Sequence, residues 1–269
     1  DDRNIWHSFW NGTVWSGWRD DLGATGDVIQ VDIDPAGFAY ADALNICCDA
    51  GVFLRGMLEH LDTDRAATAW HAEEVAATRL RWRKEIGAER PGILPVCDAL
   101  KEVLPEDVMI FSDMTQFAYA AKEVWDMDTP GRWHHPYGFG TLGYAMPAAI
   151  GGAIARPDSP TMAIIGDYGF HYTMQELGVA VELGLSLPIL LWDNGKLGEI
   201  EASMVSAQIA PNAVVARNPD FCKLAEAFGA RSAAPSSLGA LQQAVRDAFA
   251  ADGPTLIHVA SDIATTGQL

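Results

Sequence analysis

The sequence predicts an α/β protein with a doubly wound parallel sheet and helices on both faces. Short apolar runs alternate with stretches whose apolar residues have helical spacing, and this alternation is typical of parallel sheets. The runs short enough to be buried strands are Val108–Phe111, Thr161–Ile165, Leu187–Trp192 and Thr255–Val259. The stretches with helical spacing are Leu94–Leu104, Gly143–Ala155, Thr173–Leu183, Phe221–Phe228 and Leu238–Ala250.

The part of the chain before residue 93 follows a different pattern. Val28–Pro35 predicts a buried strand that ends in a turn, and Gly51–Leu61 predicts a helix. Arg65–Ile86 is also helical but carries many charges, so we expect a solvated helix that connects two parts of the chain. Glu89-Arg-Pro-Gly92 ends this helix, because proline and glycine disfavour its continuation. The chain therefore divides into residues 1–64, a helical connector over 65–92, and a larger domain over 93–269.

Composition limits the partners that are open to the chain. Hydrophobic residues make up 49% of the 269 residues and charged residues 20%, which is enough apolar material for a sizeable core. No apolar run approaches the roughly 20 residues of a membrane helix and no signal-like segment opens the chain, so we expect a cytoplasmic protein. The net charge of −18 favours solubility and disfavours nucleic acid or membrane partners. An anionic ligand would have to be held by a metal and by backbone N–H groups.

Two loops that follow predicted strands carry the residues most suited to chemistry. Gly166-Asp-Tyr-Gly-Phe170 follows one buried strand, and Trp192-Asp-Asn-Gly-Lys-Leu-Gly198 closes the next. Ligands collect at the carboxyl ends of strands in an open α/β sheet, so we expect Asp167 and Asn194 to lie side by side there. A carboxylate, an amide oxygen and a backbone carbonyl suit Mg²⁺, which completes its octahedron with phosphate oxygens and water.

The segment between these loops adds a possible anion site. Thr173-Met-Gln-Glu176 has the pattern of a capping box, so we expect a helix to begin there. Its first turn, with Gly166 and Gly169 before it, would offer N–H groups to an anion. A Gly-Asp turn alone is more often structural, but the order strand, turn, helix, strand, asparagine indicates a site for a magnesium-bound diphosphate. A nucleotide-binding domain fits less well, because no Gly-x-Gly-x-x-Gly follows the first strand and no P-loop lysine motif is present.

These segments resemble the thiamine diphosphate enzymes, in particular the acetolactate synthases and benzoylformate-type decarboxylases. Gly166-Asp-x-Gly and the Asn-Gly after the next strand resemble the thiamine diphosphate motif of that family. Gly138–Gly151 resembles the segment that cradles the thiamine ring, and Val28–Pro35 resembles the closing strand of the central domain. The resemblance covers residues 27–262, and Ser112-Asp-x-Thr-Gln116 and Gly198-Glu-Ile200 look most similar to guanidino-oxopentanoate-type 2-oxo acid decarboxylases.

The resemblance implies a thiamine diphosphate-binding fold over residues 93–269, preceded by the tail of a central α/β domain over residues 1–64. It implies that Asp167 and Asn194 bind Mg²⁺ through their side chains and Lys196 through its carbonyl. The diphosphate would lie against Gly166, Tyr168, Gly169 and Phe170.

Other expected cofactor contacts lie just before the helix predicted over Gly143–Ala155. The Gly140 carbonyl would accept a hydrogen bond from the 4′-amino group of the pyrimidine, with Thr141 beside it. Leu142 would be the apolar wedge that bends the cofactor, which brings the amino nitrogen to the thiazolium C2. Thr115 and Gln116 would also contact the cofactor.

Some positions leave two interpretations open. Tyr168 stands where the family has a third glycine, and its side chain would either point away from the diphosphate or crowd it. Asp193 replaces the commoner asparagine and adds a negative charge that could repel the diphosphate. Glu199 is either a proton relay that faces the substrate or a solvated carboxylate at a helix start. His134 and His135 either contact a substrate carboxylate or are ordinary structural histidines.

The family's other features imply partners for this chain. Its members carry an N-terminal pyrimidine-binding domain whose glutamate activates the cofactor, and they bind the cofactor between domains, usually across a dimer interface. We expect this chain to lack that domain, to form a homodimer or tetramer, and to be inactive in isolation. The leading interpretation is decarboxylation of a small 2-oxo acid. The alternatives are an acetolactate synthase-like carboligase and a non-catalytic binding module.

Overall fold

Two compact units, Asp1–Glu74 and Val75–Leu269, make up the chain. The computed structural model describes residues 29–38, 43–61, 71–215 and 217–266. The division falls within helix α4 (Ala72–Glu89), whose only buried residue is Ile86, as a solvated connector would require. The domain limits expected at residues 64 and 92 stay a prediction. Residues 1–28 and 65–70 of the predicted segments lie outside the described residues.

Within residues 29–38 and 43–61 of the first unit, the chain forms a parallel pair of short strands, a 3-10 turn and a helix. Strand β1 (Ile29–Asp32) pairs with β2 (Leu44–Cys47), and Ile29 lies opposite Leu44. A 3-10 turn, η1 (Pro35–Gly37), follows β1 and is capped by the Asp34 side chain. Helix α3 (Ala50–His60) is capped by Asp49. The strand expected from Val28–Pro35 is confirmed as β1, but the expectation that it is buried was wrong, because its four residues are exposed or half-buried. The helix expected from Gly51–Leu61 is confirmed as α3, whereas β2 was not predicted, because its four residues give too short a pattern.

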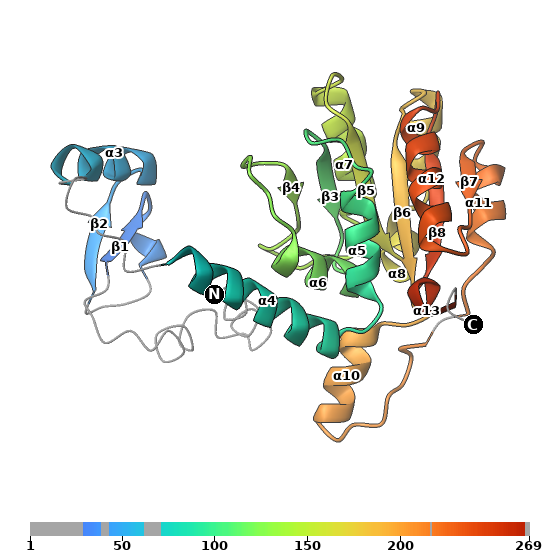
Figure 1. Cartoon of the computed structure of the whole chain (residues 1–269). Helices are drawn as coiled ribbons and strands as arrows, with labels where there is room; N and C mark the ends of the chain where they lie inside the picture. Colours follow the sequence, from blue (N-terminus) through green and yellow to red (C-terminus); the bar gives the residue numbers. More distant parts are fainter. Residues whose placement is uncertain (1–28, 39–42, 62–70, 216, 267–269) are drawn as a thin grey trace. The chain divides into compact units, whose positions relative to one another are not determined.

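A six-stranded, wholly parallel sheet forms the second unit (Figure 1). The strand order is β4-β3-β5-β6-β8-β7. After β3 the chain adds β4 on one side and then returns to add β5 on the other, so the direction of winding reverses beside β3. The doubly wound sheet expected from the sequence is thus confirmed. Its strands are β3 (Met109–Ser112), β4 (Trp133–His134), β5 (Thr161–Gly166), β6 (Pro188–Asp193), β7 (Arg231–Ala233) and β8 (Thr255–Ala260).

Helices cover both faces of this sheet, and each face has its own core. Alternate residues of one strand enter different cores: Ile164 of β5 packs in the first cluster, while Ala163 and Ile165 pack in the second. Strands buried on both faces explain why these segments read as continuous apolar runs. The first core is covered by α5 (Ile93–Lys101), α6 (Gln116–Val124) and α12 (Leu238–Phe249), and the second by α7 (Ala145–Ala155), α9 (Glu176–Glu182) and α11 (Phe221–Ala227).

One helix start was predicted wrongly. The helix expected to begin at Thr173 is replaced by α8 (Asp167–Thr173), which starts directly after β5, and by α9, which starts at Glu176. Thr173 therefore ends a helix, and its hydroxyl donates to the Gly143 carbonyl at 3.0 Å instead of capping one. Helix α10 (Gly198–Ser206) begins where one interpretation of Glu199 placed a helix start, whereas α13 (Ile263–Thr266) was not predicted. Within the described ranges, no helix has the length and apolar character that a bilayer span requires.

Alanine substitutions at two adjacent glycines of α7 test how closely this helix packs on the sheet. A Cβ atom on Gly152 would lie 2.4 Å from the Phe111 ring, so Gly152→Ala should destabilise the fold by about 1–3 kcal/mol through overpacking. A Cβ atom on Gly151 would meet nothing within 4 Å, so Gly151→Ala should stabilise the helix by up to about 1 kcal/mol. Urea unfolding of both variants measures the difference. Equal stability of the two would contradict close packing at Gly152.

Candidate functional site

Four polar segments meet where neighbouring parallel strands end. Gly166 of β5 lies opposite Trp192 of β6, so Asp167 and the pair Asp193-Asn194 leave the sheet at the same edge. Ser112 of β3 lies opposite Ile164 of β5, which brings the segment after β3 to that edge as well. The structure therefore brings Asp167 and Asn194 to adjacent strand ends, as the sequence predicted. We call the group formed by Asp113, Thr115, Gln116, Asp167, Asp193, Asn194, Lys196 and Asn218 the strand-end site.

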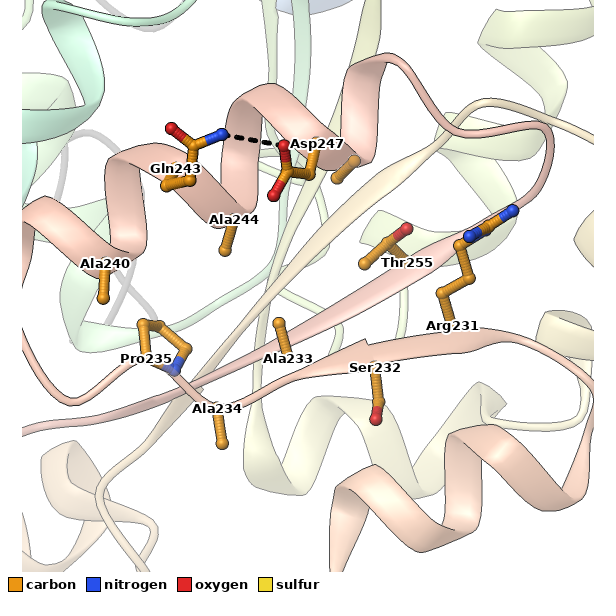
Figure 2. Close-up of a pocket in the computed structure, with 11 residues that line it drawn as sticks. Arg231, Ser232, Ala233, Ala234, Pro235, Ala240, Gln243, Ala244, Asp247 and Thr255 are labelled. Carbon is orange, nitrogen blue, oxygen red and sulfur yellow. Dashed lines mark hydrogen bonds between the residues drawn. The ribbon is translucent and has the colours of Figure 1, made fainter.

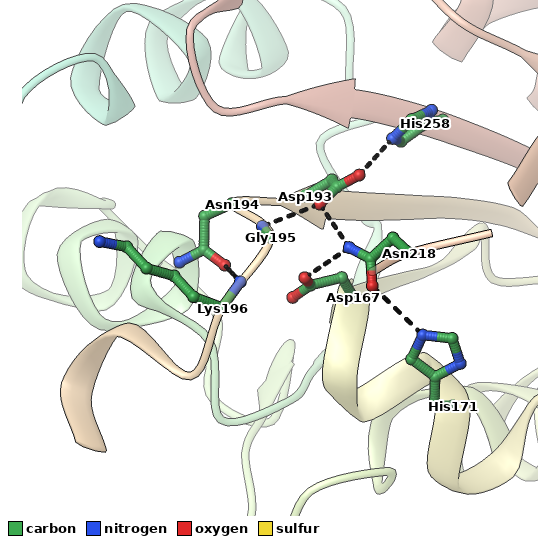
Figure 3. A network of polar contacts seen from close by, with 8 residues as sticks. All are labelled: Asp167, His171, Asp193, Asn194, Gly195, Lys196, Asn218 and His258. Atoms are coloured by element: carbon green, nitrogen blue, oxygen red, sulfur yellow. Dashed lines mark hydrogen bonds and ion pairs between the residues drawn. The ribbon is translucent and has the colours of Figure 1, made fainter. Parts of the chain in front are cut away.

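Asp167 is a buried carboxylate, and one of its two oxygen atoms accepts a side-chain hydrogen bond. Only 3% of the residue is exposed, and its Oδ2 accepts a hydrogen bond from Asn218 Nδ2 at 2.8 Å. Burial raises the pKa of Asp167, and the nearby Asp193 raises it further, while the Asn218 hydrogen bond and the Tyr168 N–H oppose the rise. In Figure 3 the carboxylate of Asp167 faces the loop that carries Asn194 and Lys196. A cation bound there would offset the cost of burying this charge.

Asp193 is turned toward β8, and hydrogen bonds outweigh burial in setting its pKa. Its Oδ2 lies 2.8 Å from His258 Nε2, and its Oδ1 accepts from Asn218 Nδ2 at 2.8 Å and from the Gly195 N–H at 3.0 Å (Figure 3). Burial would raise the pKa of Asp193, but the hydrogen bonds from His258, Gly195 and Asn218 outweigh it and hold the pKa below its usual value. The negative charge that Asp193 adds in place of asparagine is therefore stabilised by hydrogen-bond donors within the protein.

Asn194 is oriented by hydrogen bonds from two directions. Its Nδ2 donates to Gln116 Oε1 at 2.9 Å, and its Oδ1 accepts the Lys196 N–H at 3.3 Å. Because Nδ2 is used by Gln116, Oδ1 is the atom left to face a cation. Gly195 has a φ of 67°, which favours glycine, and the space beside it is open. The Lys196 ammonium pairs with Glu201 at 2.7 Å, so it does not supply the positive charge at this site.

Asp113 is a site residue that the sequence analysis missed. It is fully buried, and its carboxylate accepts the N–H groups of Met114 at 3.0 Å, Gly143 at 2.8 Å and Tyr144 at 3.4 Å. A Cβ atom on Gly169 would lie 2.1 Å from Asp113 Oδ2, so only glycine fits there. Asp113 therefore fixes the start of α7 against the first turn of α8. Its position directly after a buried strand, like that of Asp167, was the available signal.

The predicted cofactor segments lie around this edge. Thr115 precedes α6 without a capping hydrogen bond from its side chain, and it lies beside Gly166, since a Cβ atom on Gly166 would lie 3.3 Å from the Thr115 side chain. Gly140 has a φ of 69° and donates its N–H to the Pro136 carbonyl at 2.8 Å. Thr141 is exposed and Leu142 is half-buried, just before Gly143 is held by Asp113. The cofactor roles expected for these residues stay predictions.

Tyr168 and Phe170 occupy different surroundings in α8. Phe170 is fully buried and its ring lies edge-on to Phe221, with ring centroids 5.7 Å apart. Tyr168 is half-buried and shares a helix face with the exposed Tyr172, four residues later. Because the Phe170 ring is buried in the core, only the backbone groups of Phe170 are available to contact a diphosphate.

His134 and His135 lie at the carboxyl end of the edge strand β4. His134 stacks on Phe111, with ring centroids 4.5 Å apart. His135 Nδ1 lies 2.8 Å from Ser112 Oγ, and burial, with help from Lys122, lowers its pKa to about 3. The imidazole of His135 is therefore neutral near pH 7, so any contact with a substrate carboxylate would be a hydrogen bond from a neutral ring.

Glu199 lies in the first turn of α10, at the end of the loop that carries Asn194. Its Oε2 is 3.5 Å from Arg90 Nη2, and its side chain is 33% exposed. Burial raises the pKa of the neighbouring Tyr119, and the charges of Glu199 and Asp113 raise it further. Glu199 is thus partly accessible and paired with a cation that the sequence analysis did not single out.

A cleft of about 520 Å³ lies elsewhere, between β7 and α12 (Figure 2). It is lined by Arg231, Asp247 and several alanines, and by Thr255, the first residue of β8. Because β8 runs from Thr255 to Ala260, this cleft lies at the amino end of the strand. It is therefore separate from the strand-end site. In the described part of the chain, no three His, Cys, Asp or Glu side chains cluster as metal ligands, so a metal would need amide and carbonyl oxygens too.

Comparison with known proteins defines the class to which this fold and site belong. Residues 113–259 match the family model described as the thiamine pyrophosphate enzyme, C-terminal TPP binding domain. The chain belongs to the thiamine pyrophosphate enzyme family. The matched range begins at Asp113 and includes the loops after β5 and β6.

Individual relatives refine this similarity. The chain is 37% identical over 245 residues to the "Probable 2-ketoarginine decarboxylase AruI" of Pseudomonas aeruginosa, which covers 90% of this chain and 44% of that protein. It is 29% identical to the "Acetolactate synthase isozyme 2 large subunit" of Escherichia coli, over 87% of this chain and 43% of that protein. The fold resembles the 4-hydroxybenzoylformate decarboxylase of Rhodococcus jostii, with a TM-score of 0.72 and 22% identity over 87% of this chain and 44% of that one. The chain spans less than half the length of these relatives.

The pH dependence of stability tests the buried state of Asp113. Burial raises its pKa from 3.8 to about 6, so the folded chain holds this proton more tightly than the unfolded chain. The resulting stability is fully present below about pH 4 and is lost as the pH rises through 6. Asp113→Asn lacks this contribution, so the gap in unfolding free energy between wild type and variant should shrink by about 3 kcal/mol from pH 3.5 to pH 7.

Urea unfolding at the two pH values measures this gap. Asp158→Asn, an exposed position before β5, is the matched control and should show no such trend. A gap for Asp113→Asn that is the same at both pH values would contradict the assignment.

Proposed function

We propose that this chain binds Mg²⁺ and thiamine diphosphate and supplies the diphosphate-binding half of a 2-oxo acid decarboxylase. One observation carries the proposal: the Asp167 carboxylate and the Asn194 amide extend from adjacent strand ends and are both held in place by other side chains. Hard oxygen atoms in this arrangement suit Mg²⁺. The family membership of the chain supports the choice of diphosphate.

The residues present fit such a group. Asp167 Oδ1, Asn194 Oδ1 and the Lys196 carbonyl would hold the cation. The raised pKa of Asp167, caused first by burial, describes a carboxylate that a cation would stabilise. The ammonium of Lys196 is paired with Glu201, so a metal is the source of positive charge that the diphosphate would need. Thr115 beside Gly166, and Gln116 beside Asn194, would complete the wall of the site.

The rest of the chain would position the cofactor ring and the substrate. The segment Gly140–Leu142 would hold the pyrimidine, because it leads into α7 and Asp113 fixes the N–H groups of Gly143 and Tyr144. When bound, thiamine diphosphate supplies an electron sink for the bond that breaks on loss of CO₂. Glu199, part-exposed beside Arg90, would relay a proton, and His134 and His135 would border the substrate. The acid–base group that activates the cofactor would come from a pyrimidine-binding domain outside these residues, across a dimer or tetramer interface.

We propose a 2-oxo acid with a guanidinium side chain as the substrate. The relative named for 2-ketoarginine shares 37% identity over 90% of this chain. A net charge of −18 would attract a cationic substrate. The second candidate is carboligation, because several relatives are named acetolactate synthases and they match 75–90% of this chain. The two reactions share the loss of CO₂ and differ in the step after it.

Product analysis separates these candidates. The 269-residue chain, combined with its pyrimidine-binding domain, Mg²⁺ and thiamine diphosphate, should convert 2-oxo-5-guanidinopentanoate to the aldehyde one carbon shorter. It should act on pyruvate more slowly. Acetolactate as the main product from pyruvate would favour the carboligase, and turnover by the 269-residue chain alone would contradict the proposed division of the site.

Calorimetry tests the cation site directly. Thiamine diphosphate with Mg²⁺ should bind the 269-residue chain combined with its pyrimidine-binding domain, and Asp167→Ala should weaken binding by at least about 100-fold, because a direct ligand should cost no less than its supporting residues. A chelator should abolish the binding heat of the unaltered chain, and added Mg²⁺ should restore it. Asp158→Ala, at the opposite end of β5, is the control and should bind normally. Undiminished binding to Asp167→Ala would overturn the proposed ligand set, and no binding to the unaltered chain would favour a non-catalytic module with the site crowded by Tyr168.

A further inference from the structure

Asn218 joins two carboxylates that come from neighbouring strands. Its Nδ2 donates to Asp167 Oδ2 and to Asp193 Oδ1, both at 2.8 Å. Its Oδ1 lies 3.4 Å from His171 Nε2 on the other side (Figure 3). An amide nitrogen carries two hydrogens, so one side chain can satisfy both carboxylates and offset their mutual repulsion.

The position of Asn218 is itself fixed by the start of α11. Asp220 caps this helix by accepting the Lys223 N–H at 3.1 Å. Phe221, the next residue, is fully buried and lies against His171 and His258, with ring centroids 5.5 Å and 5.4 Å away. The loop that presents Asn218 is therefore anchored two and three residues later.

His258 forms the hydrogen bond at the other end of the same network, with Asp193. An ionised carboxylate only accepts hydrogen bonds, so His258 Nε2 is the donor to Asp193 Oδ2 at 2.8 Å. Asp193 is thus clamped between β8 and Asn218, and it cannot rotate away from the amide without losing both bonds. The chain of contacts links Asp167 after β5, Asp193 on β6 and His258 on β8 through Asn218.

The geometry has a consequence for Asp167. The terminal torsion of an aspartate is broad, so a carboxylate without partners does not hold one orientation. Because Asn218 engages Oδ2, the other oxygen is directed to the loop that carries Asn194, as Figure 3 shows. A metal ligand that is oriented before binding loses less entropy when the cation arrives.

We propose that Asn218 is a positioning residue for the cation site: by bridging Asp167 and Asp193 it presents Asp167 Oδ1 to the metal. This inference rests on the proposed Mg²⁺ site, and it assigns to Asn218 no contact with the metal, cofactor or substrate. Residues that orient metal ligands typically contribute about 10–100-fold to metal affinity. The expected effect is therefore on the affinity for the cation.

Binding of Mn²⁺ in the presence of thiamine diphosphate, followed by electron paramagnetic resonance, tests this role in the 269-residue chain combined with its pyrimidine-binding domain. Asn218→Ala should weaken Mn²⁺ binding by about 10-fold or more. Asn218→Ser, a milder change that keeps the loop polar but removes the two-pronged amide, should also weaken it. Asn212→Ala, an exposed asparagine in the same loop, is the matched control and should bind Mn²⁺ like the unaltered chain.

The outcomes distinguish the positioning role of Asn218 from the cation site itself. Circular dichroism on each variant establishes that it is folded, so that a lost affinity is not lost structure. Wild-type affinity in folded Asn218→Ala or Asn218→Ser would overturn the positioning role while leaving the cation site intact. An unaltered chain that binds no Mn²⁺ with thiamine diphosphate would overturn the proposed site together with the role of Asn218.

Discussion

The arrangement of this site depends on keeping three carboxylates at one edge of a parallel sheet. Asp113, Asp167 and Asp193 follow or end β3, β5 and β6, which are neighbours in the strand order. Like charges repel strongly in surroundings of low dielectric, and the charge of Asp193 raises the pKa of Asp167 in this way. Each carboxylate therefore accepts hydrogen bonds: Asp113 from backbone N–H groups, Asp167 from Asn218, and Asp193 from His258 and from the same Asn218.

These donor sets give the three carboxylates different properties. Burial raises the pKa of Asp113 to about 6 even though three N–H groups point at it, which suits a residue that organises loops. The pKa of Asp193 is lowered because its hydrogen bonds outweigh burial, so it stays charged and bound to His258. Asp167 has a raised pKa and fewer donors, and it is the one that faces the Asn194 loop. A cation is the partner that would complete its surroundings.

The same edge explains how an acidic chain could hold a diphosphate. With 36 acidic residues, the chain has twice as many acidic as basic residues, and Lys196, in the Asn194 loop, is paired with Glu201. A divalent metal supplies concentrated positive charge at one point and leaves the remaining surface negative. The glycines at 143, 169 and 195 serve this arrangement for separate reasons: 143 and 195 have positive φ values, and 169 has no room for a Cβ atom.

Sequence patterns located the central strands because they are buried on both faces, so each reads as an apolar run that needs no knowledge of its neighbours. They failed for β2, β4 and β7, whose two to four residues carry little periodic signal. The capping-box pattern at Thr173 was misleading, because the helix had already begun at Asp167 and the threonine hydroxyl found a tertiary acceptor in Gly143. Local hydrogen-bonding patterns compete with partners that only folding supplies.

The sequence by itself determined the parallel α/β architecture and the convergence of Asp167 and Asn194, since both follow from apolar runs and from the rule that parallel strands end at one edge. Only the tertiary structure decided how those side chains are oriented. Asn218 and His258 lie 51 and 91 residues beyond Asp167 in the chain, and Asp113 lies 54 residues before it. Hydrogen bonds across such separations depend on strand order and loop course, which no local pattern of residues records.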